Sequence, residues 1–337
     1  MKKPSIPPAL ALFVLSPTIG ELLSGSSPPV EFFKPINFLL LACLYGSGAV
    51  VVRELKVKWK KDYRASLLLG AAYGIIEEGL TVASFFNPNW MDLGILGSFG
   101  RVFEVNWVWA EMLTIYHAVF SITIPIVLIE LVYPSRELTR LASDRSLKGV
   151  IALFIGTIIT EFYLFSLLGK HVPPTFQYIA TVLVVFFIVY LTYKLKPKRE
   201  DAAIKKIGKP TKMYVIGLAG STSFFLIFWS GPHIFNHPII ILSLGIVLVF
   251  GILKYMERFE WKGSDSYQSR LAVVAGALSF LIVLAFIQEL DHKIVDNTTG
   301  MGVVGLLSAI ALLLLGKRLK KIMVGKRIFC QLVTNKP

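Results

Sequence analysis

Lysine and arginine are distributed very unevenly along a chain that is otherwise strongly apolar. Ten apolar stretches of 16 to 26 residues lie near 8–24, 36–53, 65–86, 107–132, 148–168, 174–193, 213–230, 237–253, 271–288 and 301–316. Each is long enough to cross ~30 Å of hydrocarbon as an α-helix. If alternate connections lie on one side, that side holds 31 of the 35 Lys and Arg residues. Because basic residues are retained in the cytoplasm during insertion, the sequence predicts about ten transmembrane helices with both termini cytoplasmic.

Composition fits an all-α, polytopic integral membrane helix bundle, since 55% of the residues are hydrophobic and only 17% are charged. A net charge of +14 would suggest nucleic acid binding in a soluble protein. Here the basic residues lie in short connections such as the basic loop 194–212, where they contact anionic membrane lipids. We therefore expect a multi-pass protein of the cell membrane without a nucleic acid partner. Residues 1–337 form one transmembrane domain, with a polar part at 1–135 and a plainer helical part at 136–337.

Six acidic residues lie inside the predicted spans, where an ionisable side chain is costly unless it is paired, protonated or hydrated. They are Glu21, Glu77, Glu78, Glu111, Glu130 and Glu161. Glu130 lies near the cytoplasmic end of its span, where snorkelling is easy, and is interpreted as structural. The other five lie toward the outer face, as do the histidines, with His117 near the middle of the membrane. Helix packing is an alternative explanation for any one of them, but the whole set predicts an outward-facing site.

Periodicity places the strongest candidates on two consecutive spans. Gly70, Tyr73, Glu77, Thr81 and Ser84 follow one face of the third span, with Glu78 about 100° around the helix. Ala110, Thr114, His117 and Ser121 form a stripe on the fourth, with Glu111 beside it. Consecutive spans usually pack together, so the Glu pair and His117 are expected to meet. Adjacent carboxylates in a low dielectric cannot both stay ionised without a nearby cation, so one of the pair should be protonated or the two should share a bound cation. The candidate catalytic residues are Glu77, Glu78, His117 and Glu111.

Two outer connections are placed to cover such a site. The first, 24–29, joins small residues to two prolines, which favour a stiff extended backbone. The second, 87–106, contains Arg101, the only basic residue of that connection available to partner the carboxylates. Trp90, Trp107 and Trp109 are interpreted as interfacial anchors. The candidate ligand-binding residues are Glu21, Ser26, Ser27, Asn87, Arg101 and Thr114.

Any bound metal must be held by histidine and carboxylate side chains, because Cys43 and Cys330 are too far apart in the predicted topology to form a cage. His233 and His237 form an HxxxH, which suits zinc on a continuous helix, although the bracketing prolines predict a turn or a helix start. The candidate ligands are Glu77, Glu78, His117, His233 and His237, and the cofactor considered is a divalent metal such as Zn.

The same positions resemble motifs of the CAAX-processing and bacteriocin-protection family of intramembrane proteases. That family's motifs resemble Glu-Glu-xxx-Arg, Phe-xxx-His and His-xxx-Asn. Here Glu77-Glu78 lacks the following Arg, Leu113 stands at the Phe position before His117, and the third motif ends in His237. The resemblance covers these positions alone. It implies an intramembrane protease, whereas an outward-facing site does not suit that family's prenylated cytoplasmic substrates.

Three functions are compatible with the sequence, and whether the protein is an enzyme is left open. The first is a membrane-embedded hydrolase, with Glu77 or Glu78 activating water and a lipid or peptide bound from the outer face. The second is a proton- or cation-coupled transporter of a small solute that uses the same Glu pair and His117. The third is a non-catalytic membrane scaffold. Below Pro125 the fourth span is apolar, which favours a one-sided pocket and therefore the hydrolase.

Overall fold

Almost the whole chain is helical in a computed structural model that describes residues 6–168, 171–196, 206–291 and 296–334. Eight helices in this part of the chain are long and apolar enough to cross a membrane. The first predicted span is a shorter apolar helix, Pro8–Leu23. The third, residues 63–81, is helical too but carries Arg64 and the Glu pair. The prediction of an all-α membrane bundle is therefore confirmed, and the helix count is close to the expected ten.

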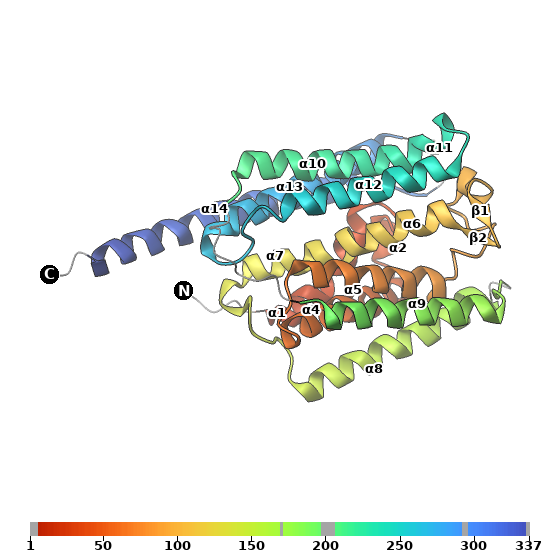
Figure 1. Ribbon diagram of the computed structural model, residues 1–337, viewed down its shortest axis with the longest axis horizontal. Helices are drawn as coiled ribbons and strands as arrows, with labels where there is room; N and C mark the ends of the chain where they lie inside the picture. Colours follow the sequence, from red (N-terminus) through yellow and green to blue (C-terminus); the bar gives the residue numbers. More distant parts are fainter. Residues whose placement is uncertain (1–5, 169–170, 197–205, 292–295, 335–337) are drawn as a thin grey trace.

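The chain folds into two parts, of six and four spans. The six-span part comprises α1 (Pro8–Pro17), η1 (Thr18–Leu23), α2 (Pro29–Phe32), α3 (Pro35–Leu41), η2 (Ala42–Gly46), α4 (Ser47–Lys58), α5 (Tyr63–Ile76), η3 (Glu77–Thr81), η4 (Gly94–Gly97), β1 (Arg101–Val102), β2 (Val105–Asn106), α6 (Trp107–Tyr116), η5 (His117–Thr123), α7 (Ile124–Val132), η6 (Pro134–Arg136), α8 (Asp144–Glu161), η7 (Phe162–Leu168) and α9 (Thr175–Lys194). The four-span part comprises α10 (Pro210–Phe225), η8 (Leu226–Ser230), α11 (Gly231–Ile234), α12 (Pro238–Met256), η9 (Ser264–Ser266), α13 (Tyr267–Leu290) and α14 (Met301–Thr334). The termini lie at one end of the bundle, and the antiparallel β1–β2 hairpin and α11 lie at the other (Figure 1).

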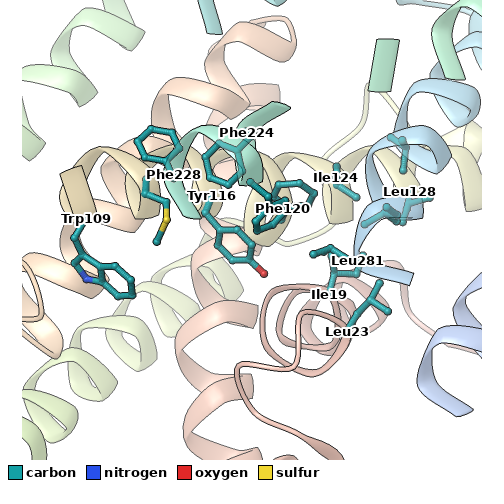
Figure 2. Packing of buried hydrophobic residues seen from close by; sticks show 14 of the residues in the cluster. Ile19, Leu23, Trp109, Tyr116, Phe120, Ile124, Leu128, Phe224, Phe228 and Leu281 are labelled. Carbon is teal, nitrogen blue, oxygen red and sulfur yellow. The ribbon is translucent and has the colours of Figure 1, made fainter. Parts of the chain in front are cut away.

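The continuous helix α6–η5–α7 joins the two parts. Figure 2 shows Tyr116, Phe120, Ile124 and Leu128 from this helix packed against aromatic residues of α10 and η8 and against Leu281 of α13. Ile19 and Leu23 of η1 close the same cluster from the six-span part. These side chains are all buried. Because lipid tails are as apolar as these side chains, close packing rather than exclusion of water holds the two parts together within the membrane. A side chain on α6–η5–α7 is therefore held from both sides.

Wide π-helical turns interrupt five spans of the six-span part. They are η1, η2, η3, η5 and η7. Glu21, Tyr45, the Glu pair and His117 lie within four of them, and Glu161 directly precedes the fifth. Such turns are rare and are frequently found at functional sites, because they shift side chains out of the regular helical register. Periodicity along a straight α-helix does not reveal them.

Ion pairs between the two parts form near the end that carries the termini. Glu130 of α7 is buried between Lys56 of α4 and Arg270 of α13, and the Arg270 Nη2–Glu130 Oε2 distance is 2.9 Å. Arg270 also contacts Glu137 at 2.5 Å. Glu130 is thus structural, as predicted, but the expected reason was wrong. It does not snorkel to the interface, because two buried basic groups satisfy its carboxylate within the bundle.

A cavity of about 730 Å³ lies between the two parts at this same end. We call it the inter-part crevice. Its walls come from α5, α6, η5 and α7 on one side and from α10, α12 and α13 on the other. It reaches Thr114 and Ala118, so its inner end comes within one helical turn of His117.

Candidate functional site

Close packing of α5 against η5 brings the Glu pair and His117 together. A Cβ atom at Gly74 would lie 2.8 Å from Cβ of His117, and one at Gly70 would lie 2.9 Å from Cα of Ala118. These distances are too short for any side chain, and glycines four residues apart are a common way for membrane helices to approach closely. The two glycines therefore set the distance between the third span and the histidine of the fourth.

Both glutamates of the pair face His117. Nε2 of His117 lies 3.1 Å from Oε1 of Glu78, and Nδ1 lies 3.4 Å from Oε2 of Glu77. All three side chains are buried, and one ligand atom from each lies within 4.8 Å of the others. A regular α-helix would place adjacent residues about 100° apart. The π turn that begins at Glu77 changes this register, so both carboxylates reach the imidazole.

A second layer of side chains orients the three. Oγ of Ser121 lies 3.0 Å from Nδ1 of His117. Ser84 donates a hydrogen bond to Oε2 of Glu78 and accepts one from Nε1 of Trp109 at 2.9 Å. Ser84 follows Ala83, whose φ of 56° lies in the left-handed region that costs a non-glycine residue roughly 1–2 kcal/mol. This turn ends the third span and directs Ser84 back toward Glu78.

Further carboxyl groups surround Glu77. The hydroxyl of Tyr45 donates to Oε1 of Glu21, and the Tyr45 and Tyr73 side chains both interact with Glu77. Glu161 lies within electrostatic range of Glu77. We define the acidic cluster as Glu21, Glu77, Glu78, Glu161 and His117. Among the described residues, its ion pairs involve His117 and neither Lys nor Arg, so it combines four carboxyl groups with one imidazole. In a low dielectric this excess of acid must take up protons or a cation.

Several predicted residues lie elsewhere. Glu111 is on another face of α6, where its carboxylate lies next to Gly245 of α12, and it does not join the three residues around His117. Arg101 does not reach the carboxylates. It donates to Oδ1 of Asn106 at 2.8 Å and to the carbonyl oxygen of Phe86 at 2.9 Å. Thr114 faces the inter-part crevice instead of the acidic cluster.

The candidate residues in the loops make local contacts. Oδ1 of Asn87 accepts a hydrogen bond from the amide of Asn89 at 2.9 Å, and Nδ2 of Asn37 donates to Oγ of the buried Ser27 at 3.1 Å. Ser26 is exposed, and its amide donates to Oγ of Ser24. The connection at 24–29 is thus tied to α3 by Asn37 and to α13 by Nε2 of Gln288, which donates to the carbonyl oxygen of Ser24 at 3.1 Å. These polar atoms make structural contacts, and Glu21 is the candidate ligand-binding residue that belongs to the acidic cluster.

The predicted HxxxH does not lie on a continuous helix. His233 is in the short helix α11 and His237 is the residue before α12, as the prolines indicated, and both side chains are exposed. Neither joins the group around His117.

The interfacial role assigned to Trp109 is wrong, because this residue is buried and its indole holds Ser84. Trp107, by contrast, is 47% exposed. Tyr45, which contacts Glu21, was not among the predicted site residues. Its position amid glycine and serine in an otherwise apolar span was the available signal.

Residues 10–287 match a family described as an uncharacterized membrane protein family, and the chain belongs to that family. No curated protein and no solved structure is detectably similar to it. Family membership agrees with the many apolar helices in describing a multi-pass membrane protein. The chemistry of the protein must therefore be inferred from the buried Glu77, Glu78 and His117.

Proposed function

We propose that this protein is a membrane-embedded, metal-dependent hydrolase that acts on a lipid or peptide entering from the outer face of the membrane. One observation carries the proposal. Glu77, Glu78 and His117 are buried together, with one ligand atom from each within 4.8 Å of the others. A divalent cation would balance an acid-rich cluster that no Lys or Arg neutralises within the described residues.

The three side chains fit a catalytic metal centre. Two ligands at about 2.0–2.2 Å from one ion can be at most about 4.4 Å apart, so a separation within 4.8 Å requires only a small closure. One imidazole and two carboxylates suit Zn and related divalent metals, and three protein ligands leave a position for water. Ser121 beside His117 and Ser84 on Glu78 are the supporting contacts that metal ligands usually have.

The two carboxylates differ in their surroundings. Ser84 and Trp109 hold Glu78 in place. Oε2 of Glu77 is buried and, within the described residues, forms no hydrogen bond. Glu78 therefore suits the role of a fixed ligand. Glu77 suits that of a ligand that would bind through one oxygen while its other oxygen takes a proton from water. A bound divalent ion would supply the activation of that water. Glu21 and Glu161 lie within electrostatic range of Glu77 and add further carboxyl groups beside the proposed base.

A proton- or cation-coupled transporter is the second candidate. The inter-part crevice approaches His117 from the end opposite the hairpin, and a transporter needs access from both ends. The same carboxylates would then carry protons or a cation between two openings.

Elemental analysis of the purified full-length protein tests the proposal. We expect one Zn, Mn or Fe per chain, lost in His117→Ala and in Glu78→Gln. Glu111→Gln is the matched control, because it neutralises another glutamate within a span without touching the three residues. The hydrolase requires this metal together with cleavage of a lipid or peptide in proteoliposomes. Absence of metal combined with pH-dependent solute uptake would reject the hydrolase in favour of the transporter.

A further inference from the structure

We propose that the inter-part crevice is a binding site for one anionic membrane phospholipid. One of its acyl chains occupies the space between the two parts, and its phosphate lies at the basic mouth. The site is separate from the proposed metal centre, because Glu77, Glu78 and His117 are not among the residues that line it.

The walls of the crevice are mainly apolar. Leu67 and Ala71 of α5 face Val249 and Ile252 of α12 across it, and Val273 of α13 contributes to the same lining. The volume of about 730 Å³ falls inside the roughly 300–1,000 Å³ typical of ligand sites. These walls are helices whose backbone groups are already paired within each helix. A peptide would leave its own amides unsatisfied there, whereas a hydrocarbon chain has no such groups to pair.

The mouth of the crevice has a positive charge that its own carboxylates do not cancel. The basic residues that line it are Lys56, Lys60, Lys61, Arg64, Arg270 and Lys262. Its three acidic residues are already engaged, since Asp62 pairs with Arg64, Glu130 pairs with Lys56 and Arg270, and Glu137 pairs with Arg270. The surplus charge belongs to Lys60, Lys61 and Lys262.

These three ammonium groups are placed to receive a phosphate. Lys60 and Lys262 are exposed at the mouth. Nζ of Lys61 donates to the backbone carbonyls of Tyr193, at 2.8 Å, and of Leu195, which hold the ammonium group without neutralising it and leave one N–H for a phosphate. Anionic lipid headgroups are attracted by basic residues at a membrane surface, by about 1 kcal/mol for each Lys or Arg. A zwitterionic headgroup would not gain this attraction.

The crevice is deep enough to hold a lipid chain. Its lining extends from Glu130 to Thr114 along α6–η5–α7, and over shorter stretches of α5 and α12. At ~1.5 Å per residue the stretch along α6–η5–α7 measures roughly 24 Å, the greater part of a ~30 Å hydrocarbon core. The mouth lies at the end to which the distribution of basic residues assigns the cytoplasm, where the membrane surface is negatively charged. One lipid chain therefore fits between the mouth and Thr114.

Native mass spectrometry of the full-length protein with added phosphatidylglycerol or phosphatidylcholine tests this site. We expect one phosphatidylglycerol to remain bound at energies that remove phosphatidylcholine. Lys60→Glu combined with Lys262→Glu should weaken its binding at least about tenfold. Arg145→Glu combined with Lys148→Glu is the control, because it makes the same change in charge at exposed positions outside the crevice.

A second pair of variants tests the apolar part. Val249→Trp fills the crevice and should abolish retention of the lipid. Val247 of the same helix is 66% exposed and lies outside the crevice, so Val247→Trp should not affect retention. Equal retention of the two lipids, or equal effects of the crevice and control variants, would overturn the proposal. A dimer that forms in wild type and is lost in Val249→Trp, without a lipid adduct, would instead identify a second copy of the chain as the occupant.

Discussion

Two buried clusters of charged groups lie at different depths in the bundle, and they are built in opposite ways. The acidic cluster contains four carboxyl groups and one imidazole. The second, which we call the paired cluster, consists of Lys56, Glu130, Glu137 and Arg270, with equal numbers of acidic and basic groups. Both are held by helices of the six-span part, and the paired cluster also includes Arg270 of α13.

This difference separates structural charge from functional charge. A balanced buried cluster satisfies itself, so removal of one member leaves an opposite charge without a partner. An acid-rich cluster is incomplete until protons or a cation enter it, so loss of one carboxyl group removes repulsion as well as a ligand. Substitutions in the paired cluster should therefore affect folding, and those in the acidic cluster should affect function.

The largest expected effect is the loss of Arg270 from the paired cluster. Arg270→Met keeps the length of the side chain but leaves Glu130 and Glu137 short of a buried cation. We expect destabilisation by about 3–5 kcal/mol, seen as a large fall in thermal midpoint in detergent. Adding Glu130→Gln and Glu137→Gln to Arg270→Met should recover part of the loss. A thermal midpoint unchanged from wild type would mean that the ion pairs do not hold the two parts together.

The next largest effect is expected in the acidic cluster, where a substitution should lower activity and leave stability nearly unchanged. Glu78→Gln keeps the shape of the side chain but removes a negative ligand beside His117. We expect hydrolytic activity to fall by about 10²-fold or more, while the thermal midpoint stays near that of wild type. Activity and melting measured on the same preparation check this. A variant that does not fold, or that works normally, would remove Glu78 from the site.

The sequence alone revealed the spans and the meeting of Glu77, Glu78 and His117. Both came from simple rules, because long apolar stretches must cross the membrane and consecutive spans usually pack together. Gly70, on the predicted Glu77 face of α5, packs directly against Ala118 of η5. These features depend on local pattern, which a single sequence records directly.

The remainder of the site depends on backbone irregularity and on packing between distant segments. Periodicity placed Glu111 next to Thr114, beside the stripe that contains His117, but Glu111 and His117 do not meet in the structure. The π turn at Glu77 brings both glutamates inward, although the sequence did not specify which one faced the bundle. The partnership of Glu21 with Tyr45 joins separate spans. No local pattern encodes such contacts.

A smaller effect should follow when the acidic cluster is pushed apart without loss of a charged group. A methyl group at Gly74 would lie 2.8 Å from Cβ of His117, so Gly74→Ala must move the histidine or the third span. We expect destabilisation by roughly 1–3 kcal/mol together with weaker metal binding, measured by thermal melting and metal titration. Gly149→Ala in α8, where the new Cβ meets nothing within 4 Å, is the control. Equal metal affinity in the two variants would show that this close approach does not shape the site.

The smallest effect is expected at Asp62. Its ion pair with Arg64 lies nearer to solvent than the paired cluster, so it shows how much stability a less buried ion pair contributes. Asp62 caps α5 by accepting a hydrogen bond from the amide of Arg64 at 3.0 Å, and its side chain pairs with the Arg64 guanidinium at 2.8 Å. Burial alone would raise the pKa of Asp62, but the hydrogen bonds and charge of Arg64 outweigh it and hold that pKa below its ordinary value.

Because the folded-state pKa is the lower one, the stabilisation by Asp62 is fully present above the unfolded value of about 4 and is lost as the pH falls through the folded value. We expect Asp62→Ala to cost about 1 kcal/mol at neutral pH. The gap in thermal midpoint between wild type and variant should stay constant from about pH 5 to 8 and close at lower pH. Glu31→Gln, in an exposed pair with Lys34, should leave the midpoint nearly unchanged. If Asp62→Ala instead costs as much as Arg270→Met, charge pairing rather than burial determines the strength of these contacts, and the contrast between the two clusters loses its physical basis.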